Sequence, residues 1–333
     1  MKSKTSALII GVGSIGERHL RCFQESGLFT VAVCERNAEL GRSIMAKYAC
    51  PFYGTLDESL EAETFDLAVV CTPANTHIPI AMECVRRGLH VLLEKPLSVS
   101  LDGVAELKQL ADARQRTIRV AYPLRAIPAL LALKDLLLEE KLGKIRHLSV
   151  VTGQDFPRLR PAYRTIYYTR HETGGGSIQD ALTHQFHTIE WLVSPIHSVF
   201  ASAAHQVLEG VEVEDTVNLV ATLDDGTLAS FAFNHFQAHN ESTITLNGTQ
   251  GSARFEMHTQ RLGLFPHGGS EWTWTDYSLE KYDQVFIQQA VYFLAAISGQ
   301  DTPLATLDDA LQTLKVNLAA LESARTHREV IIE

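Results

Sequence analysis

The motif G-x-G-x-x-G at residues 11–16 constrains the fold of this chain more than any other feature. It follows an apolar run expected to form a buried strand, residues 6–10, and opens a helical pattern at residues 15–27. In such a turn the first glycine permits the bend, the second lets a pyrophosphate approach, and the third allows close helix–strand packing. The helix N-terminus adds unpaired N–H donors. We therefore predict dinucleotide binding by Gly11, Gly13, Ser14, Ile15 and Gly16.

An acidic residue stands where a ribose-binding carboxylate is expected. The second strand, at residues 30–34, leads into Glu35, roughly 20 residues after the last glycine of the motif. A carboxylate there accepts from ribose hydroxyls and repels the 2′-phosphate of NADP, which favours NAD. Arg36 keeps NADP as the alternative, because a guanidinium can bind that phosphate or stack on adenine.

The first 122 residues alternate between strand and helix patterns. The strand runs are almost continuously Val, Ile, Leu and Ala, which is typical of parallel strands covered by helices on both faces. This pattern predicts a doubly wound α/β domain. The expected strands are 6–10, 30–34, 66–71, 90–94 and 118–122, and the expected helices are 15–27, 38–48, 78–88 and 101–115.

Beyond residue 122 the pattern changes to several strands with few helices. Asp225-Gly226 and Asn247-Gly248 are hairpin signals and predict a largely antiparallel or mixed sheet. We therefore expect two domains, an α/β domain at residues 1–122 and an α+β domain at residues 123–333. The expected strands of the second are 145–152, 199–207, 216–223, 227–234 and 242–246, and its helices are 126–140, 178–193, 284–298 and 307–324.

Composition excludes several function classes. The formal net charge of −10 disfavours binding to nucleic acid or to an anionic membrane. The longest apolar runs fall far short of the roughly 20 residues that span a bilayer, and the glycines at 11 and 13 interrupt any signal-peptide core. Five cysteines, odd in number and without C-x-x-C spacing, disfavour a disulfide framework or a zinc site. These observations predict a soluble, cytoplasmic protein without a metal.

Four further segments resemble one family over essentially the whole chain. They are Glu94-Lys95-Pro96, the run C-T-P-A-N-T-H at 71–77, three glycines at 174–176 followed by Asp180 and His184, and T-P-L-A-T-L-D-D-A at 302–310. The chain is similar to the Gfo/Idh/MocA oxidoreductases. The resemblance implies a Rossmann domain, a C-terminal α+β domain for substrate binding and oligomerisation, and a homodimer or homotetramer. It also implies NAD(P)-dependent hydride transfer to or from a cyclic sugar, polyol or derivative.

The resemblance also assigns roles to individual residues. Lys95 would contact the nicotinamide ribose and the reacting hydroxyl, and Asp180 and His184 would complete a catalytic triad with it. Many family members carry aspartate three residues after the catalytic histidine, where this chain has His187, so contacts to substrate there are expected to differ. The remaining residues that would line the cofactor are Thr72, Pro73, Asn75, His77 and Glu94.

These residue types suit oxidation of an alcohol. The ordinary pKa of histidine, roughly 6.5, lets His184 accept the hydroxyl proton, while Lys95 stabilises the developing alkoxide. Asp180, four residues earlier on the predicted helix, could orient His184 or pair with Lys95. Two alternatives stay open at this point. Asp180 could serve only in a helix cap of the form S-x-x-D, or Asp180, His184 and His187 could form a metal site, which we favour less.

An arginine- and tyrosine-rich segment, residues 156–170, precedes the expected catalytic helix. Arginine binds carboxylates and phosphates bidentately, so we expect this segment to contact substrate, and we hypothesise an anionic group on that substrate. The alternative is a subunit contact or a solvated loop. The substrate contacts expected from this segment and from the end of the last Rossmann strand are Tyr122, Arg125, Arg160, Tyr163 and Arg164.

Two other functions remain as alternatives. The first is an oxidoreductase that retains its nucleotide and recycles it between two substrates, as in glucose-fructose oxidoreductase. The second is a non-enzymatic regulator that responds to NAD(P). The presence of Lys95, Asp180 and His184 together argues against the regulator, which would not need all three.

Overall fold

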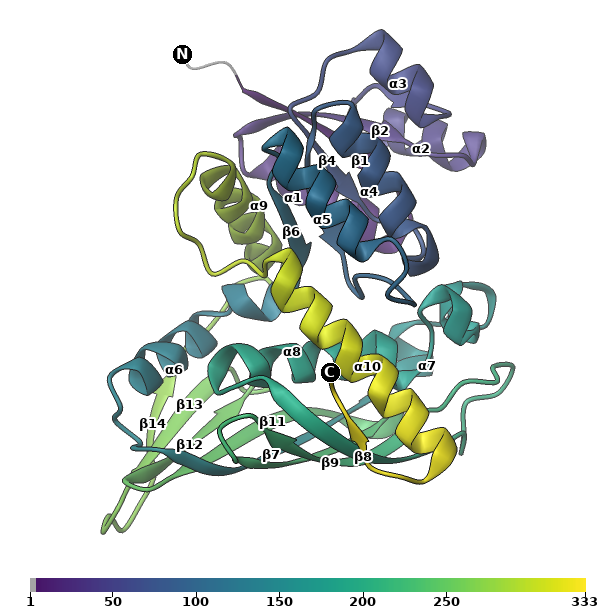
Figure 1. Cartoon of the computed structure of the whole chain (residues 1–333). Helices are drawn as coiled ribbons and strands as arrows, with labels where there is room; N and C mark the ends of the chain where they lie inside the picture. Colours follow the sequence, from purple (N-terminus) through teal and green to yellow (C-terminus); the bar gives the residue numbers. More distant parts are fainter. Residues whose placement is uncertain (1–3) are drawn as a thin grey trace. The chain divides into compact units, whose positions relative to one another are not determined.

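The computed structural model describes residues 4–333 and divides into two compact units (Figure 1). The first unit runs to Ala126 and also contains Glu280–Ala310. The second unit comprises Ile127–Leu279 and Leu311–Glu333. The sequence predicted a single domain boundary near residue 122. The chain instead returns to the first unit at Glu280 and leaves it again after Ala310.

The first unit contains a six-stranded parallel sheet in the order β3-β2-β1-β4-β5-β6. This order reverses direction between β1 and β4, which is the arrangement of doubly wound nucleotide-binding sheets. The predicted fold class is confirmed. The strands are β1 (Thr5–Ile10), β2 (Phe29–Cys34), β3 (Phe52–Tyr53), β4 (Leu67–Val70), β5 (His90–Glu94) and β6 (Ile118–Ala121).

Helices and short turns connect these strands. The sequence analysis missed β3, which has only two residues, and α3, which begins with a capping box between Thr55 and Glu58. The helices are α1 (Ser14–Glu25), α2 (Ala38–Tyr48), α3 (Leu56–Ala62), α4 (His77–Arg86), α5 (Val104–Arg114) and α9 (Asp283–Ile297), with short helices η1 (Ala74–Thr76) and η2 (Pro123–Ala126).

Helix α9 belongs to the first unit because its apolar face completes that core. Ala290 and Phe293 share one buried cluster with Leu20 and Phe23 of α1. At the polar edge of the same contact, the Arg21 guanidinium donates to Asp283 Oδ2. Burial of this helix therefore draws a segment from late in the sequence into the nucleotide-binding unit.

The second unit is built on a nine-stranded mixed sheet in the order β14-β13-β12-β11-β7-β10-β9-β8-β15. Strands β7 and β10 are parallel, and the other neighbouring pairs are antiparallel. The predicted hairpins join β9 to β10 and β11 to β12. The strands are β7 (Ile145–Asp155), β8 (Ile196–Ala204), β9 (Thr216–Leu223), β10 (Leu228–Asn234), β11 (Phe236–Gly248), β12 (Gly251–Glu256), β13 (Arg261–Pro266), β14 (Thr273–Asp276) and β15 (Val330–Ile331).

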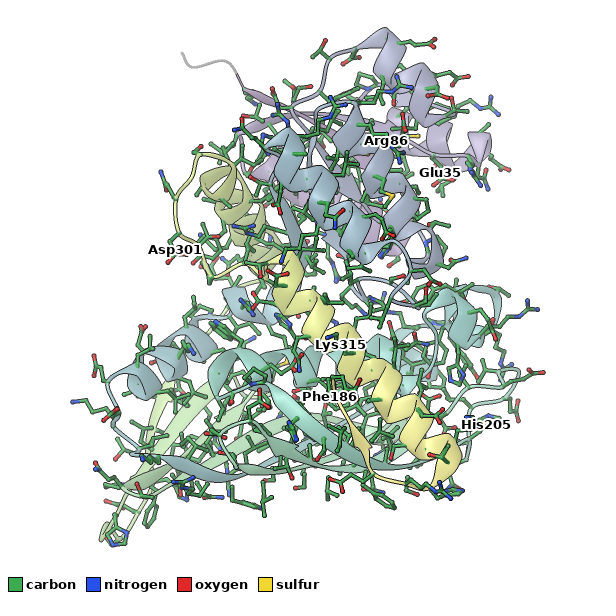
Figure 2. All side chains as sticks on the ribbon, in the orientation of Figure 1. Glu35, Arg86, Phe186, His205, Asp301 and Lys315 are labelled. Carbon is green, nitrogen blue, oxygen red and sulfur yellow. The ribbon has the colours of Figure 1, made fainter. Side chains whose placement is uncertain are left out.

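The helix predicted at 178–193 has two parts. A π-helical turn, η6 (Ile178–Leu182), leads directly into α8 (Thr183–Leu192). Phe186 of α8, which Figure 2 labels, is buried. Its ring meets that of Phe231 of β10 edge-on, with ring centroids 5.1 Å apart. The other helices are α6 (Pro128–Leu138), α7 (Phe156–Leu159), η3 (Tyr163–Thr165), η4 (Tyr167–Thr169), η5 (His171–Thr173) and α10 (Leu307–Thr326).

No helix within residues 4–333 combines the length and the apolar character that a bilayer crossing requires.

We predict that Phe186→Ala lowers the free energy of unfolding by about 3–5 kcal/mol, because it leaves a cavity between α8 and the sheet. Urea unfolding followed by circular dichroism measures the change. Phe236→Ala, which truncates a more exposed ring on β11, is the control and should change stability by under about 0.5 kcal/mol. Equal effects of the two substitutions would contradict this packing account.

Candidate active site

The glycine turn between β1 and α1 has the geometry that its sequence predicts. Gly11 has φ +81° and donates its N–H to Cys34 O at 2.8 Å. A Cβ at Gly16 would lie 1.9 Å from Gly11 O, so no side chain fits there. A Cβ at Gly13 would meet nothing within 4 Å, so the backbone beside the N-terminus of α1 borders open space. These residues fit the pyrophosphate of a dinucleotide.

Glu35 lies directly after β2 and contacts this turn. One carboxylate oxygen accepts from Val12 N at 3.0 Å, and the other accepts from Asn37 N at 2.9 Å. The two bonds hold a negative charge beside the glycine turn, at the strand end where the sequence predicted a carboxylate that binds ribose. Arg36 follows as an exposed side chain. Figure 2 labels Glu35 in the first unit.

His77, which was expected to line the nicotinamide, lies inside the first unit. The imidazole is buried, with Nε2 at 2.8 Å from Thr72 O and Nδ1 at 3.0 Å from Pro96 O. Burial lowers the pKa of His77 because desolvation disfavours the imidazolium. His77 therefore joins the segments that follow β4 and β5, whereas Pro73 and Asn75 are exposed on the first of these segments.

Glu94 and a residue that the sequence analysis missed hold the segment that carries Lys95. Glu94 Oε2 accepts from Lys95 N at 3.1 Å, and Oε1 lies 2.6 Å from His19 Nε2. Both side chains are buried. His19 falls three residues after Gly16 on the buried side of α1, and that position is the only signal in the sequence that could have identified it. Lys95 itself is half-buried.

Asp180 and His184 occupy successive turns of the second unit's π–α helix. Asp180 lies in η6 and His184 in α8, and both are half-buried. Asp180 Oδ1 accepts a hydrogen bond from Tyr167 Oη at 2.8 Å. The structure thus places a carboxylate and an imidazole one helical turn apart and adds a tyrosine that the sequence analysis did not select.

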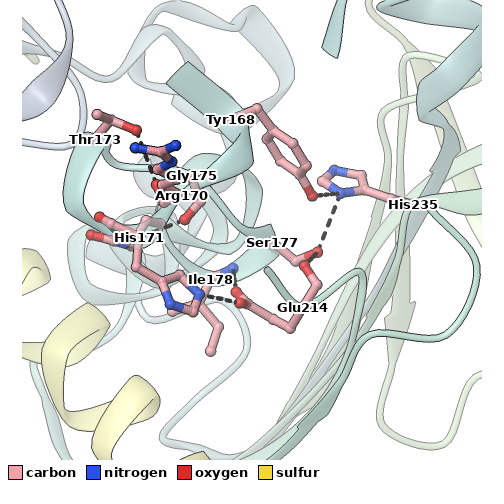
Figure 3. A network of polar contacts seen from close by, with 10 residues as sticks. Tyr168, Arg170, His171, Thr173, Gly175, Ser177, Ile178, Glu214 and His235 are labelled. Carbon is pink, nitrogen blue, oxygen red and sulfur yellow. Dashed lines mark hydrogen bonds and ion pairs between the residues drawn. The ribbon is translucent and has the colours of Figure 1, made fainter. Parts of the chain in front are cut away.

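The start of this helix is fixed by Glu214, which comes from the segment before β9 (Figure 3). Its Oε1 accepts from Ile178 N at 2.8 Å, and its Oε2 lies 2.6 Å from His171 Nε2. Ser177 Oγ donates to the Glu214 carbonyl at 2.9 Å. The alternative of an S-x-x-D cap does not apply, because Ser177 makes no side-chain cap bond to the helix and Glu214 supplies the acceptor instead.

His187, which was expected to contact substrate, has a partner on α10. The side chain is buried, and Nδ1 lies 2.9 Å from Thr313 Oγ1 of α10. Thr313 in turn donates to Glu190 Oε2 at 2.6 Å. Within residues 4–333, no three His, Cys, Asp or Glu side chains are grouped so that they could hold a metal ion.

Two residues of the arginine-rich segment serve the packing of that segment. Tyr163 is buried beside Phe156, and its hydroxyl donates to Glu209 O at 3.0 Å. Arg164 pairs with Glu209 Oε2 at 3.0 Å, with its guanidinium 5.4 Å from the Tyr163 ring centroid. The Glu209 carboxylate therefore offsets the charge of Arg164, which weakens the hypothesis of an anionic substrate. Arg160 is exposed.

Tyr122 and Arg125 were expected to line a cleft, but both are buried within the first unit. The Arg125 guanidinium lies 3.3 Å from Pro303 O and 3.2 Å from Asp309 Oδ2. Arg125 thereby ties η2 to the segment that precedes and begins α10. Its charge is matched locally by Asp309, and a substrate contact of Arg125 stays a prediction.

Two family models match the chain. The model described as an oxidoreductase family with an NAD-binding Rossmann fold matches residues 5–122, and the GFO/IDH/MocA C-terminal domain matches residues 130–254. The chain belongs to the Gfo/Idh/MocA family of NAD-binding oxidoreductases. Both halves of the sequence-based resemblance are thus confirmed.

The individual relatives described here share 27% or less of their residues with this chain. The rhizopine catabolism protein MocA of Rhizobium meliloti is 27% identical over 222 residues, which are 66% of this chain and 68% of that protein. Inositol 2-dehydrogenase of Rhizobium meliloti (strain 1021) is 23% identical over 335 residues, covering 97% of this chain and 98% of the relative. Levoglucosan dehydrogenase, solved in complex with NADH, has the same fold, with a TM-score of 0.89 and 19% identity across 99% of this chain and 100% of that chain.

The pair formed by His171 and Glu214 generates a prediction about pH. The bond to the Glu214 carboxylate raises the pKa of His171, so the imidazolium is more stable in the folded chain than in the unfolded chain. This stabilisation is complete below the unfolded pKa, roughly 6.5, and is lost as the pH rises through the higher folded pKa. The destabilisation caused by His171→Gln should therefore be larger at pH 6 than at pH 9.

Urea unfolding of both proteins across that range measures the difference. His197→Gln is the control, because it removes an exposed pair with Asp224 and leaves Glu214 unchanged. A destabilisation by His171→Gln that grew with rising pH would contradict the assigned direction.

Proposed function

We propose that the protein is an NAD-dependent dehydrogenase that oxidises a secondary alcohol of a cyclic sugar or polyol, or reduces the corresponding ketone. The observation that carries the proposal is the pairing of Asp180 and His184 on one helix in a chain whose glycine turn fits a dinucleotide. The names of two relatives, inositol 2-dehydrogenase and levoglucosan dehydrogenase, support a cyclic polyol or sugar as the substrate class.

In this proposal the protein's own residues manage the proton and the charge. A bound nicotinamide would supply the hydride acceptor. His184 would remove the hydroxyl proton as general base, and Lys95 would stabilise the oxygen as negative charge develops on it. Asp180 would hold His184 in the productive orientation. Glu94 and His19 would keep the main chain at Lys95 in place through the buried pair described above. In ketone reduction, His184 would return the proton to the oxygen, and Lys95 would act as hydrogen-bond donor to that oxygen.

Substitution of the two proton-handling residues tests the mechanism. We expect Lys95→Met and His184→Gln each to lower kcat by about 10²–10⁴, because each removes a group that acts in the transition state. The Kd for NADH, measured by fluorescence titration, should stay within about threefold of wild type. A panel of inositols, sugars and sugar acids, followed by nicotinamide absorbance, provides the substrate.

Lys108→Met is the matched control, because Lys108 is an exposed lysine of α5 that pairs with Asp308. Wild-type turnover in both Lys95→Met and His184→Gln would refute the assignment. Denaturing the purified protein and assaying the released nucleotide separates a cofactor exchanged in each turnover from one that is retained.

The choice of NAD over NADP is a second part of the proposal. Glu35 holds its negative charge beside the glycine turn, where it would repel a 2′-phosphate. We expect Glu35→Gln to raise kcat/KM for NADP relative to NAD by about tenfold, because it removes the charge and keeps an amide oxygen for Val12 N. Glu39→Gln, an exposed change in the first turn of α2, should leave the ratio unchanged. An unaltered ratio in Glu35→Gln would contradict the role assigned to this carboxylate.

A further inference from the structure

Tyr167 contacts a residue of the proposed catalytic set, yet no role has been assigned to it so far. Its hydroxyl donates to Asp180 Oδ1 at 2.8 Å across thirteen residues of sequence. The side chain is 39% exposed, so burial alone does not hold the ring in position. The position of the hydroxyl must therefore depend on how the main chain around Tyr167 is fixed.

The main chain is fixed by the turn that follows Tyr167, of which Figure 3 labels Arg170, Thr173 and Gly175. Thr173 Oγ1 lies 2.5 Å from Tyr167 O and 3.0 Å from Arg170 O, so its single hydroxyl proton is within reach of both carbonyl oxygens. Gly175 N also donates to Arg170 O, at 2.9 Å. A Cβ at Gly175 would lie 2.2 Å from Tyr168 O, so a glycine is required where the two stretches of backbone touch. The segment carrying Tyr167 therefore packs directly on the three glycines that precede the catalytic helix.

The next residue, Tyr168, anchors the same segment from inside the unit. Its ring is fully buried, and its hydroxyl lies 2.6 Å from His235 Nδ1. The same nitrogen lies 3.2 Å from Ser177 Oγ, at the residue before η6 (Figure 3). Two consecutive tyrosines thus contact the same helix, Tyr168 through His235 at its buried start and Tyr167 at the carboxylate of Asp180.

The chemistry of the contact suits a carboxylate that must stay charged. A phenol donates a strong hydrogen bond to an ionised carboxylate and favours that form over the neutral acid. Because the phenol carries no charge, it orients Asp180 without offsetting its negative charge, as an arginine or lysine partner would. The bond also restricts the rotation of the Asp180 side chain, which comes before His184 by one helical turn.

We propose that Tyr167 is a positioning residue, which holds the ionised carboxylate of Asp180 in the orientation that hydride transfer requires. The inference rests on the proposed function, because it assigns Tyr167 a part in the same reaction. It adds to that function a contribution from the segment before the catalytic helix, made through a hydroxyl that need not touch the substrate.

A double-mutant cycle between Tyr167→Phe and Asp180→Asn tests the proposal. We expect Tyr167→Phe to lower kcat by about 10- to 100-fold, the range for losing a hydrogen bond to a charged group, with KM for NAD unchanged. In the Asp180→Asn background the same change should lower kcat by under about twofold, because the charged acceptor is already gone. A full additional loss in that background would overturn the proposal, as would a kcat of Tyr167→Phe equal to that of wild type.

Two control variants separate positioning from folding. Tyr53→Phe removes a tyrosine–carboxylate bond to Glu63 in the first unit and should leave kcat unchanged. Tyr168→Phe removes the buried bond to His235 and should lower the unfolding midpoint further than Tyr167→Phe, which removes the bond of a more exposed hydroxyl. A fall in kcat that tracked the loss of stability across these variants would overturn the proposal.

Failure of the proposed function is recognised separately, because it appears in the wild-type protein as absence of turnover on every polyol. In that case the double-mutant cycle is evaluated from the unfolding equilibrium constants of wild type, Tyr167→Phe, Asp180→Asn and the double variant. Additive effects of the two substitutions there would overturn the contact on which the inference depends. Coupling of about fivefold or more would support the contact.

Discussion

The close approach of two stretches of backbone, between Gly16 at the start of α1 and the carbonyl of Gly11, underlies the nucleotide-binding half of this protein. With 1.9 Å between a Cβ at residue 16 and that oxygen, only glycine permits the contact. The contact sets α1 against β1 and leaves the helix N-terminus beside the open space at Gly13. Glu35 and the pair of Glu94 and His19 can then contact the turn and the helix that it positions.

A buried carboxylate fixes the main chain in each of the two units. Glu94 accepts from the main chain of Lys95 and pairs with His19, and Glu214 accepts from the main chain of Ile178 and pairs with His171. In each case one oxygen fixes a backbone N–H near a proposed catalytic residue, and the other binds a histidine. A buried carboxylate requires such partners, because desolvation without hydrogen bonds would cost several kcal/mol. The main chain at Lys95 and at Ile178 is therefore held in place by side chains that have no proposed part in the reaction.

Sequence reasoning succeeded where the determining interactions are local. Strand and helix periodicity predicted β2, α2, β5 and β9 almost residue by residue, and the Asp225-Gly226 turn predicted the β9–β10 hairpin. It failed where a partner lies far along the chain. The helix cap from Glu214 reaches Ile178 across 36 residues, and the contact of His187 with Thr313 spans 126. Residue spacing along η6 and α8 could not identify Glu214 or Thr313 as partners, because several faces of this helix are buried and each contacts a different element.

The sequence by itself determined the strand–turn–helix unit and the family, and it contained the residues that we propose for proton transfer. Those features depend on steric limits at individual glycines and on motifs within a few residues. Only the tertiary structure decided which polar side chains are free to face a ligand. Burial assigned Arg125, Tyr163, His77 and His187 to partners inside their own units, and the turn that follows Tyr167 placed its exposed side chain against Asp180. The physical reason is that a buried polar group must find a partner, and the fold determines which partner is within reach.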